Sequence, residues 1–339
     1  MKALKFLEVG QPLQLGEADM PRAEPGGLVF KVTACGICSS DLHAVEVPGL
    51  LQRGSVLGHE YSGVVVEVGP GAEGWAIGDR LVALPGKPCG TCDACLEGRH
   101  AQCREVVMQG FDPRMPGAYA EYSACMAGLA MKIPDGLSDR DAATIEPMSV
   151  GLSAWRTAAV ASGSSVLVIG AGIIGLAVAK WARFFGAGDI AISEKIPARI
   201  ARAQECGVGI VIDAAEHADP VVEFERRTGR KPTVIFECVG RPMLAQIIAM
   251  APPHAHLVMV GTAMQQESFT VVSAALKRLR ITFALAYEVA DFPFVQRMIA
   301  EGRIKVDGLV TATVGLDEAA AMFELLGKPN DHCKVLITP

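Results

Sequence analysis

The chain has 339 residues, of which 50% are hydrophobic and 20% are charged, and its formal net charge is −6. This composition excludes extensive disorder, and the length predicts about two domains. The negative net charge gives no electrostatic basis for binding nucleic acid or an anionic membrane. The sequence has no apolar run of transmembrane length and no signal-peptide pattern, so a cytoplasmic location is expected.

The first 145 residues predict a β-rich, barrel-like domain. Short alternating segments are separated by turn signals, including Pro25-Gly26-Gly27 and Gly69-Pro70-Gly71. Many short strands with this punctuation are typical of a sheet that closes on itself. The predicted strands are Lys2–Phe6, Gly27–Thr33, Gly63–Val68 and Arg80–Ala83.

From about Glu146 onward, apolar strands alternate with helical segments. This alternation predicts an α/β domain with a doubly wound parallel sheet that is covered on both faces. The chain then closes with a strand at Lys334–Thr338, which suggests that the second domain is inserted into the first. The predicted strands are Ser165–Ile169, Asp189–Ser193, Ile210–Asp213, Thr233–Cys238 and His256–Val260, and the predicted helices are Ile173–Phe185, Ala198–Cys206, Pro220–Thr228 and Met243–Met250.

Four of the ten cysteines lie within fifteen residues, at Cys89, Cys92, Cys95 and Cys103. Cys-x-x-Cys turns direct two sulfurs at one ion, and four thiolates are a typical ligand set for tetrahedral zinc. Because all four positions are filled by protein, the predicted site is structural. The alternative is a surface loop with reduced, unpaired thiols.

A second, sparser group contains Cys38, His59 and Glu60. All three are competent zinc ligands, and a catalytic zinc needs three protein ligands and one open position. The spacing alone favours a buried cysteine and a hydrogen-bonded histidine of the protein core over a metal site.

A glycine-rich loop follows the predicted strand Ser165–Ile169 and precedes a helix. Its G-x-G-x-x-G pattern places Gly170 at the tight turn, Gly172 where backbone approaches a pyrophosphate, and Gly175 where helix and strand pack closely. The helix N-terminus, with Ile173 and Ile174 in the variable positions, would face the phosphates. The loop therefore predicts dinucleotide binding.

The strand after this helix ends at Glu194, nineteen residues beyond Gly175. A carboxylate there accepts hydrogen bonds from the adenosine ribose and repels a 2′-phosphate, which predicts NAD over NADP. Lys195 and Arg199 lie close by in the sequence, and both could meet a phosphate.

Together these motifs resemble the zinc-dependent medium-chain alcohol dehydrogenases, most closely the sorbitol and threonine dehydrogenase branches. The resemblance covers essentially the whole chain. It implies a GroES-like catalytic domain (1–147 and 287–339, with a zinc lobe at about 86–104) and an inserted Rossmann domain (148–286). It rests on Cys38-Ser-Ser-Asp-x-His43, Gly58-His59-Glu60, the four-cysteine lobe, Glu146-Pro147, Gly170–Gly175 and Phe236–Gly240.

The resemblance also implies roles for individual residues. Cys38 and His59 match catalytic zinc ligands, and Glu60 matches a residue that is a ligand in some members. Glu146 matches a position that binds zinc directly, through water, or transiently. Ser40 and His43 match the proton relay, and Asp41 matches the residue that orients the His59 ring. Val239, Arg241 and Val260 match positions that contact the nicotinamide or the pyrophosphate.

Two departures from polyol dehydrogenases bear on the substrate. Ala44 replaces a tyrosine after the relay histidine, and Ala286 replaces an arginine before the tyrosine that matches Tyr287. We therefore expect NAD-dependent oxidation of an apolar, secondary or cyclic alcohol, with a polyol or L-threonine dehydrogenase as the alternative. The candidate pocket residues, for which ordinary packing is the better explanation, are Val45, Leu50, Phe111, Met115 and Leu285.

Two other functions remain open at this stage. One is a non-catalytic dinucleotide-binding redox sensor, and the other is a zinc-independent quinone or enone reductase, although such members usually lack both ligand sets. The resemblance also implies a homodimer or homotetramer formed through edges of the Rossmann sheet, for which Val258–Thr262 and Ile281–Leu285 are candidates, although a buried core strand explains them equally well. The remaining cysteines, at positions 35, 125, 206, 238 and 333, are expected to be small buried hydrophobes.

Overall fold

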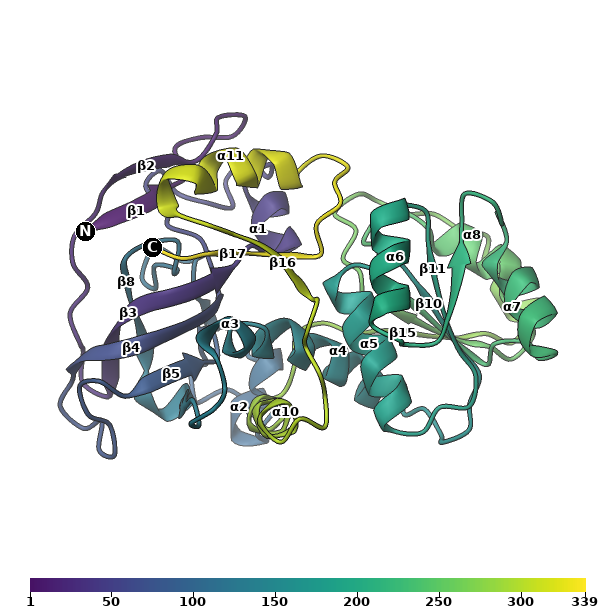
Figure 1. Cartoon of the computed structure of the whole chain (residues 1–339), viewed down its shortest axis with the longest axis horizontal. Helices are drawn as coiled ribbons and strands as arrows, with labels where there is room; N and C mark the ends of the chain where they lie inside the picture. The colour runs from purple at the N-terminus through teal and green to yellow at the C-terminus, as the bar shows by residue number, and fades with distance from the viewer. The chain divides into compact units, whose positions relative to one another are not determined.

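The computed structural model describes residues 1–339, which form two compact units (Figure 1). Unit 1 comprises Met1–Glu146, Glu288–Val306 and Val310–Pro339, and unit 2 comprises Pro147–Tyr287 with Asp307–Leu309. The sequence analysis did not anticipate that the short segment 307–309 groups with unit 2. No helix is both long enough and apolar enough to cross a bilayer.

Unit 1 is built on a seven-stranded sheet in which β3 (Gly27–Gly36) pairs antiparallel with β4 (Glu60–Val68), β8 (Tyr122–Met126) and β17 (Lys334–Ile337). Gly36 lies opposite Glu60 in the β3–β4 register. This register brings the segment that carries Cys38 next to the segment that carries His59.

Both strands extend three residues beyond their predicted limits, β3 to Gly36 and β4 from Glu60. These added residues are buried on both faces of the sheet. A segment buried on both faces loses the alternation of apolar and polar residues on which the prediction relied.

Unit 1 contains further short elements, several of which the sequence did not predict. They are β1 (Lys2–Lys5), β2 (Gln14–Glu17), α1 (Ser39–Ala44), β5 (Arg80–Ala83), β6 (Gly86–Lys87), α2 (Asp93–Leu96), η1 (His100–Gln102), β7 (Val107–Met108), η2 (Ala127–Leu129), β9 (Ala130–Lys132), α3 (Asp139–Ala142), α10 (Asp291–Ala300), β16 (Val310–Val314), α11 (Leu316–Leu326) and the start of α4 (Ile145–Ala158).

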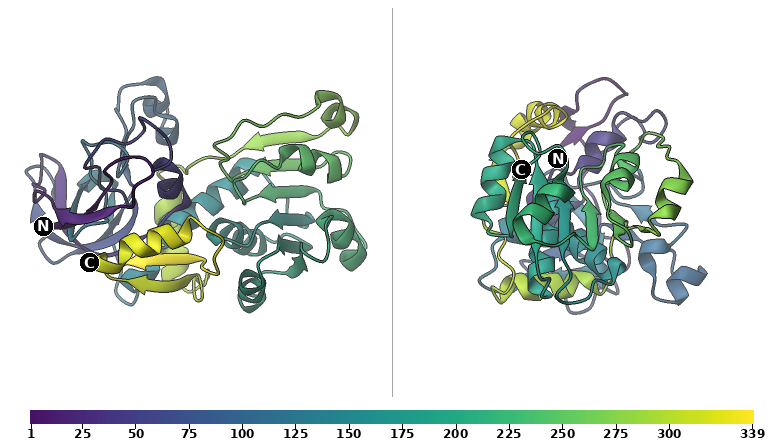
Figure 2. Two further views of the ribbon diagram at one scale, coloured as in Figure 1. Left: turned by 90° about the horizontal axis from the view of Figure 1, so that it is seen from above. Right: turned by 90° about the vertical axis from the view of Figure 1, so that its right-hand side faces the viewer.

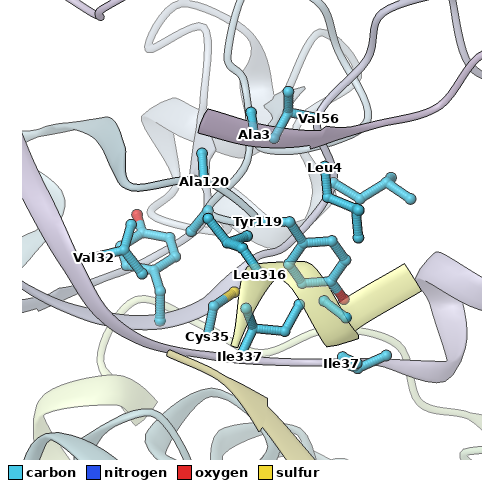
Figure 3. Close-up of a cluster of buried hydrophobic side chains, with 14 of the residues drawn as sticks. Ala3, Leu4, Val32, Cys35, Ile37, Val56, Tyr119, Ala120, Leu316 and Ile337 are labelled. Carbon is cyan, nitrogen blue, oxygen red and sulfur yellow. The ribbon is translucent and has the colours of Figure 1, made fainter. Parts of the chain in front are cut away.

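The core of unit 1 joins residues from both ends of the chain. Figure 3 shows Leu4 from β1, Cys35 from β3, Leu316 from α11 and Ile337 from β17 packed around the ring of Tyr119. The side chains of Leu4, Cys35 and Ile337 are fully buried, as is Tyr119. The C-terminal strand and helix therefore belong to the same hydrophobic core as the N-terminal strands.

Unit 2 contains a six-stranded parallel sheet in the order β12-β11-β10-β13-β14-β15. This is the strand order of the Rossmann fold, and it reverses direction between β10 and β13. The prediction of an α/β fold with a GroES-like and a Rossmann domain is confirmed. The elements are β10 (Val166–Ile169), α5 (Ile173–Phe184), β11 (Ile190–Glu194), α6 (Pro197–Glu205), β12 (Ile210–Asp213), α7 (Pro220–Thr228), β13 (Val234–Glu237), α8 (Leu244–Met250), β14 (His256–Met259), α9 (Val271–Leu276) and β15 (Arg280–Phe283).

Helices cover both faces of the unit 2 sheet (Figure 2). Leu167 of β10 clusters with Phe224 of α7 and Ile247 of α8. Trp155 of α4 stacks on Phe236 of β13 with ring centroids 6.0 Å apart. Because β10, β11, β13 and β14 are buried between two layers, they read as continuous apolar runs in the sequence.

Two expectations about unit 2 and the cysteines need correction. β14 lies between β13 and β15, so Val258–Thr262 does not form a sheet edge, whereas β15 does. Of the cysteines outside the two candidate zinc clusters, only Cys35 and Cys125 are buried. The other three, Cys206, Cys238 and Cys333, are only partly buried, because they lie at element ends and in loops.

Candidate active site and cofactor site

The short helix α1 begins directly after Cys38 and is anchored by Asp41. One Asp41 oxygen, Oδ2, accepts a hydrogen bond from the Cys38 backbone N–H at 3.2 Å. The other, Oδ1, lies 3.2 Å from Nδ1 of His59. Asp41 is fully buried, so its carboxylate links the backbone of Cys38 to the imidazole of His59.

The ligand atoms of Cys38, His59 and Glu60 all lie within 4.8 Å of one another. Because Asp41 occupies Nδ1 of His59, Nε2 is the nitrogen left to face a metal. Zinc bonds of about 2.0–2.3 Å would hold tetrahedral ligands about 3.5 Å apart. Thiolate, imidazole and carboxylate at this spacing therefore fit a zinc ion after a small contraction of the cluster.

The electrostatics of this cluster favour positive charge at His59. Burial alone would lower the pKa of His59, but the Asp41 carboxylate and the Cys38 thiol raise it well above its usual value. Burial works against ionisation of Asp41 too, yet His59, Tyr119 and the Cys38 N–H lower the pKa of Asp41 overall. The same negative groups would stabilise a bound cation.

Glu60 forms a buried ion pair that the sequence did not reveal. Lys334 Nζ lies 2.8 Å from Oε1 and 2.7 Å from Oε2 of Glu60, and it donates to the Ile37 carbonyl at 2.8 Å. Burial alone would lower the pKa of Lys334, but Glu60 raises it above its usual value. A Cβ atom on Gly36 would come within 1.9 Å of Glu60 Oε2, so only glycine leaves room for this carboxylate.

Glu146, the other candidate carboxylate, lies in the first turn of α4 and is 8% exposed. The group of ligand atoms formed by Cys38, His59 and Glu60 does not include it. Its charge reaches the same region, because it contributes to the raised pKa of Lys334. The structure thus groups one of the two candidate carboxylates with Cys38 and His59.

The two relay candidates lie on α1. The Ser40 hydroxyl is 3.4 Å from Nε2 of His59, on the side where the ligand atoms converge. His43 is three residues further along the helix, in its last turn, and is partly exposed. Residues three apart share a helix face, so the pair can connect the cluster to solvent.

The four-cysteine lobe brings all of its sulfurs together. The ligand atoms of Cys89, Cys92, Cys95 and Cys103 lie within 4.8 Å of one another, and the Sγ atoms of Cys89 and Cys95 are 3.9 Å apart. Tetrahedral zinc with Zn–S bonds of about 2.3 Å requires about 3.8 Å. Backbone hydrogen bonds from Thr91 and Cys92 lower the pKa of Cys89 to about 6, whereas burial raises the pKa of Cys95 to about 12. The sulfur geometry fits a closed zinc site, and a bound zinc would deprotonate both thiols.

In unit 2 the glycine-rich loop follows β10 at the point where the strand order reverses. A Cβ on Gly175 would lie 1.9 Å from the Gly170 carbonyl oxygen, whereas a Cβ on Gly172 would meet nothing within 4 Å. Gly175 is therefore required for internal packing, and the space beside Gly172 remains open for a ligand. Ile173 and Ile174 begin α5.

Glu194 is 8% exposed and its carboxylate organises this loop. Oε2 accepts from the Ala171 N–H at 3.0 Å, and Oε1 accepts from the N–H groups of Lys195 at 2.7 Å and Ile196 at 3.1 Å. Lys195 is exposed, and Nε of Arg199 is buried without a hydrogen-bond partner. Both lie close to Glu194 in the chain.

The loop after β13 lies against the glycine-rich loop. A Cβ on Gly170 would come within 2.9 Å of the Val239 side chain. Glu237, 1% exposed, accepts from the N–H groups of Val239 at 2.5 Å and Gly240 at 2.9 Å. Arg241 follows on the exposed surface, and Val260 is buried beyond β14. The sequence analysis did not identify the role of Glu237 in shaping this loop.

The candidate pocket residues do not form one group. Phe111 lies against the His59 ring, with centroids 5.5 Å apart. Val45 packs on the core of unit 1, and Leu50 and Leu285 are exposed. Met115 lines a cavity of about 1060 Å³ that contains none of the catalytic zinc candidates. Ala44 is 1% exposed and belongs to the core, so it forms no polar contact with a ligand.

The sequence analysis also missed Tyr119 and Lys334, which contact Asp41 and Glu60 respectively. No local motif marks either residue, because Tyr119 lies 78 residues from Asp41 and Lys334 lies 274 residues from Glu60. Only the general rule that buried charges are paired could have indicated that such partners exist.

Comparisons with known proteins match both units of the chain. Residues 24–135 match the alcohol dehydrogenase GroES-like domain, and residues 174–301 match the zinc-binding dehydrogenase domain. The sorbitol dehydrogenase of Bacillus subtilis is 32% identical over 320 residues, which cover 92% of this chain and 90% of that protein. The solved structure of an Escherichia coli alcohol dehydrogenase complexed with NADH has a TM-score of 0.89 and 28% identity to this chain. A zinc-binding dehydrogenase of Sinorhizobium meliloti bound to NADP has a TM-score of 0.88 and 27% identity. Each comparison covers 100% of this chain and 99% of the other chain.

The chain belongs to the zinc-dependent medium-chain alcohol dehydrogenases. It is therefore an oxidoreductase that acts on alcohols, and the predicted family and enzyme class are confirmed.

Proposed function

We propose that the protein transfers a hydride between a secondary or cyclic, predominantly apolar alcohol and NAD, with one catalytic and one structural zinc per chain. The observation that carries this proposal is the convergence of Cys38, His59 and Glu60 beside Asp41 and Ser40. A non-catalytic dinucleotide-binding protein would have no need for this complete ligand and relay set.

Cys38 and His59 would hold the catalytic zinc, with Glu60 or Glu146 as the third protein ligand. When bound, zinc supplies a Lewis acid for the alcohol oxygen, and the nicotinamide ring supplies the hydride acceptor. Ser40 accepts the hydroxyl proton, and His43 passes that proton to solvent. The reaction balances because the alcohol loses one hydride and one proton and becomes a ketone or aldehyde.

The preference for NAD is supported by Glu194. Its carboxylate is held beside the glycine-rich loop by three backbone N–H groups. Each carboxylate oxygen keeps acceptor capacity for a ribose hydroxyl, and the negative charge opposes a 2′-phosphate. Lys195 and Arg199 are the residues that would favour NADP instead. One solved relative is bound to NADH and the other to NADP, so the relatives do not decide between the two cofactors. The argument for NAD therefore depends on the residues of this chain.

The preference for an apolar alcohol is supported by Phe111 and by two alanines in the sequence. The Phe111 ring lies against the imidazole of His59. Positions 44 and 286 carry alanine where the polyol dehydrogenases that the chain resembles carry tyrosine and arginine. These side chains offer no hydrogen bonds to a chain of hydroxyl groups. A polyol is the second candidate, since sorbitol dehydrogenase is a relative at 32% identity.

Absorbance at 340 nm tests both preferences. Zinc-loaded protein is assayed with NAD or NADP and with sorbitol, threonine, and hydrophobic secondary and cyclic alcohols. We expect NAD reduction with the hydrophobic alcohols, and loss of activity on chelation. Preference for sorbitol or threonine would overturn the substrate proposal. Equal rates with NAD and NADP would overturn the role of Glu194 in cofactor choice. No reduction of either cofactor with any alcohol would favour the non-catalytic function.

We propose that a second copy of the chain pairs with β15. This edge strand, the segment that follows it and α9 carry five apolar side chains that are each at least 56% exposed: Val271, Val272, Leu276, Phe283 and Leu285. Pairing would bury this apolar patch and satisfy the edge strand. Sedimentation velocity checks this proposal, since we expect a dimer or tetramer and a monomer at micromolar concentration would contradict it.

We propose a cytoplasmic location, because the four clustered cysteines Cys89, Cys92, Cys95 and Cys103 fit a zinc site, and a reducing compartment keeps such thiols from forming disulfides. Cell fractionation provides the measurement, and recovery outside the cytoplasm would contradict the proposal.

A further inference from the structure

Tyr119 contacts both segments that carry the proposed catalytic zinc ligands. Its side chain is fully buried, and its hydroxyl donates to Oδ2 of Asp41 at 2.6 Å (the ring and its oxygen are visible in Figure 3). Its backbone N–H donates to the Leu57 carbonyl at 2.9 Å, two residues before His59. A Cβ on Gly58 would lie 2.4 Å from the Tyr119 ring, so the ring packs closely against the residue before His59.

The hydroxyl of Tyr119 determines which oxygen of the Asp41 carboxylate faces His59. Oδ2 accepts from Tyr119 and from the Cys38 N–H, and this leaves Oδ1 for Nδ1 of His59. An O–H donor to a carboxylate at 2.6 Å is a strong, charge-assisted hydrogen bond. Without that donor, a buried Oδ2 would have only the longer bond from Cys38, and the carboxylate could rotate.

We propose that Tyr119 is a positioning residue for the catalytic zinc, which acts through Asp41 to hold Cys38 and His59 in their ligand geometry. This inference rests on the proposed catalytic zinc site. The contribution of Tyr119 is to fix the orientation of the Asp41 carboxylate, which lies between the backbone of Cys38 and the ring of His59. Partners of this kind orient metal ligands and affect how tightly the metal is held.

Tyr61 offers a matched control. It is the other fully packed tyrosine of the unit 1 core, 2% exposed, and its hydroxyl donates to Oε1 of Gln109 at 2.7 Å. Tyr61→Phe therefore removes the same atom from an equally buried hydrogen bond that has no link to Asp41. A purely structural role for Tyr119 predicts similar behaviour of the two variants.

The test compares zinc release from the full-length wild type, Tyr119→Phe and Tyr61→Phe into a chromogenic chelator. We expect Tyr119→Phe to release one of the two zinc ions about tenfold faster, at the low end of the usual effect of outer partners. The second zinc should leave at the wild-type rate, and Tyr61→Phe should match the wild type for both. The visible absorption of cobalt-substituted protein should change only for Tyr119→Phe.

An Asp41→Ala background, which removes the hydrogen-bond partner of Tyr119, shows whether Tyr119 acts through the carboxylate. In that background Tyr119→Phe should no longer change the release rate, because the effects of coupled residues are non-additive. Equal release from Tyr119→Phe and Tyr61→Phe, or an effect that persists with Asp41→Ala, would overturn the inference alone. A wild type that releases only one zinc, with Cys38→Ser unchanged, would overturn the proposed catalytic zinc as well.

Discussion

Replacement of Cys38 by serine is expected to lower kcat about a thousandfold or more, because the Lewis acid is worth several kcal/mol and each 1.36 kcal/mol is tenfold in rate. Zinc content should fall from two ions per chain to one, since the four-cysteine lobe shares no ligand with this cluster. NADH binding, followed by fluorescence, should be retained, because the glycine-rich loop lies entirely in unit 2.

Cys206→Ser is the matched control for this substitution. Cys206 is also partly buried and unpaired, and it lies outside both cysteine clusters. Its replacement should leave zinc content and kcat unchanged. A Cys38→Ser variant that keeps two zinc ions and normal turnover would show that this cysteine does not hold the catalytic metal.

Lys334→Met is expected to produce the largest loss of stability among single substitutions in this region. Lys334 and Glu60 are 2% and 1% exposed at their side chains, and in the zinc-free protein removal of the lysine leaves a buried carboxylate unpaired. Loss of one partner of a buried pair typically costs about 3–5 kcal/mol in the free energy of unfolding. Thermal or urea unfolding monitored by circular dichroism provides the measurement.

Two further variants separate the pair from other effects of the substitution. The double variant Glu60→Gln, Lys334→Met should recover much of the stability, because it removes the unpaired charge. Lys231→Met breaks an exposed pair with Glu225 and should cost at most about 1 kcal/mol. If Lys334→Met and Lys231→Met destabilise the protein equally, the Lys334–Glu60 pair does not stabilise the fold as inferred.

Several features were predictable because their parts are neighbours in the chain. The glycine-rich loop, with its strand before and helix after, lies within a few residues, and the four cysteines of the lobe lie within fifteen. The parallel sheet could be predicted from the alternation of strands and helices after residue 146. By contrast, the ends of β3 and β4 were missed, because burial on both faces removes the alternating pattern.

The sequence by itself determined the class of the fold, the four-cysteine motif, the glycine-rich loop, and the residue types suited to zinc and nicotinamide chemistry. Only the tertiary structure decided which distant side chains complete the catalytic cluster. The β3–β4 register brings Cys38 to His59, the pairing of β17 with β3 carries Lys334 to Glu60, and the segment before β8 carries Tyr119 to Asp41. Such contacts join residues up to 274 positions apart, so they depend on strand pairing and core packing rather than on any local pattern.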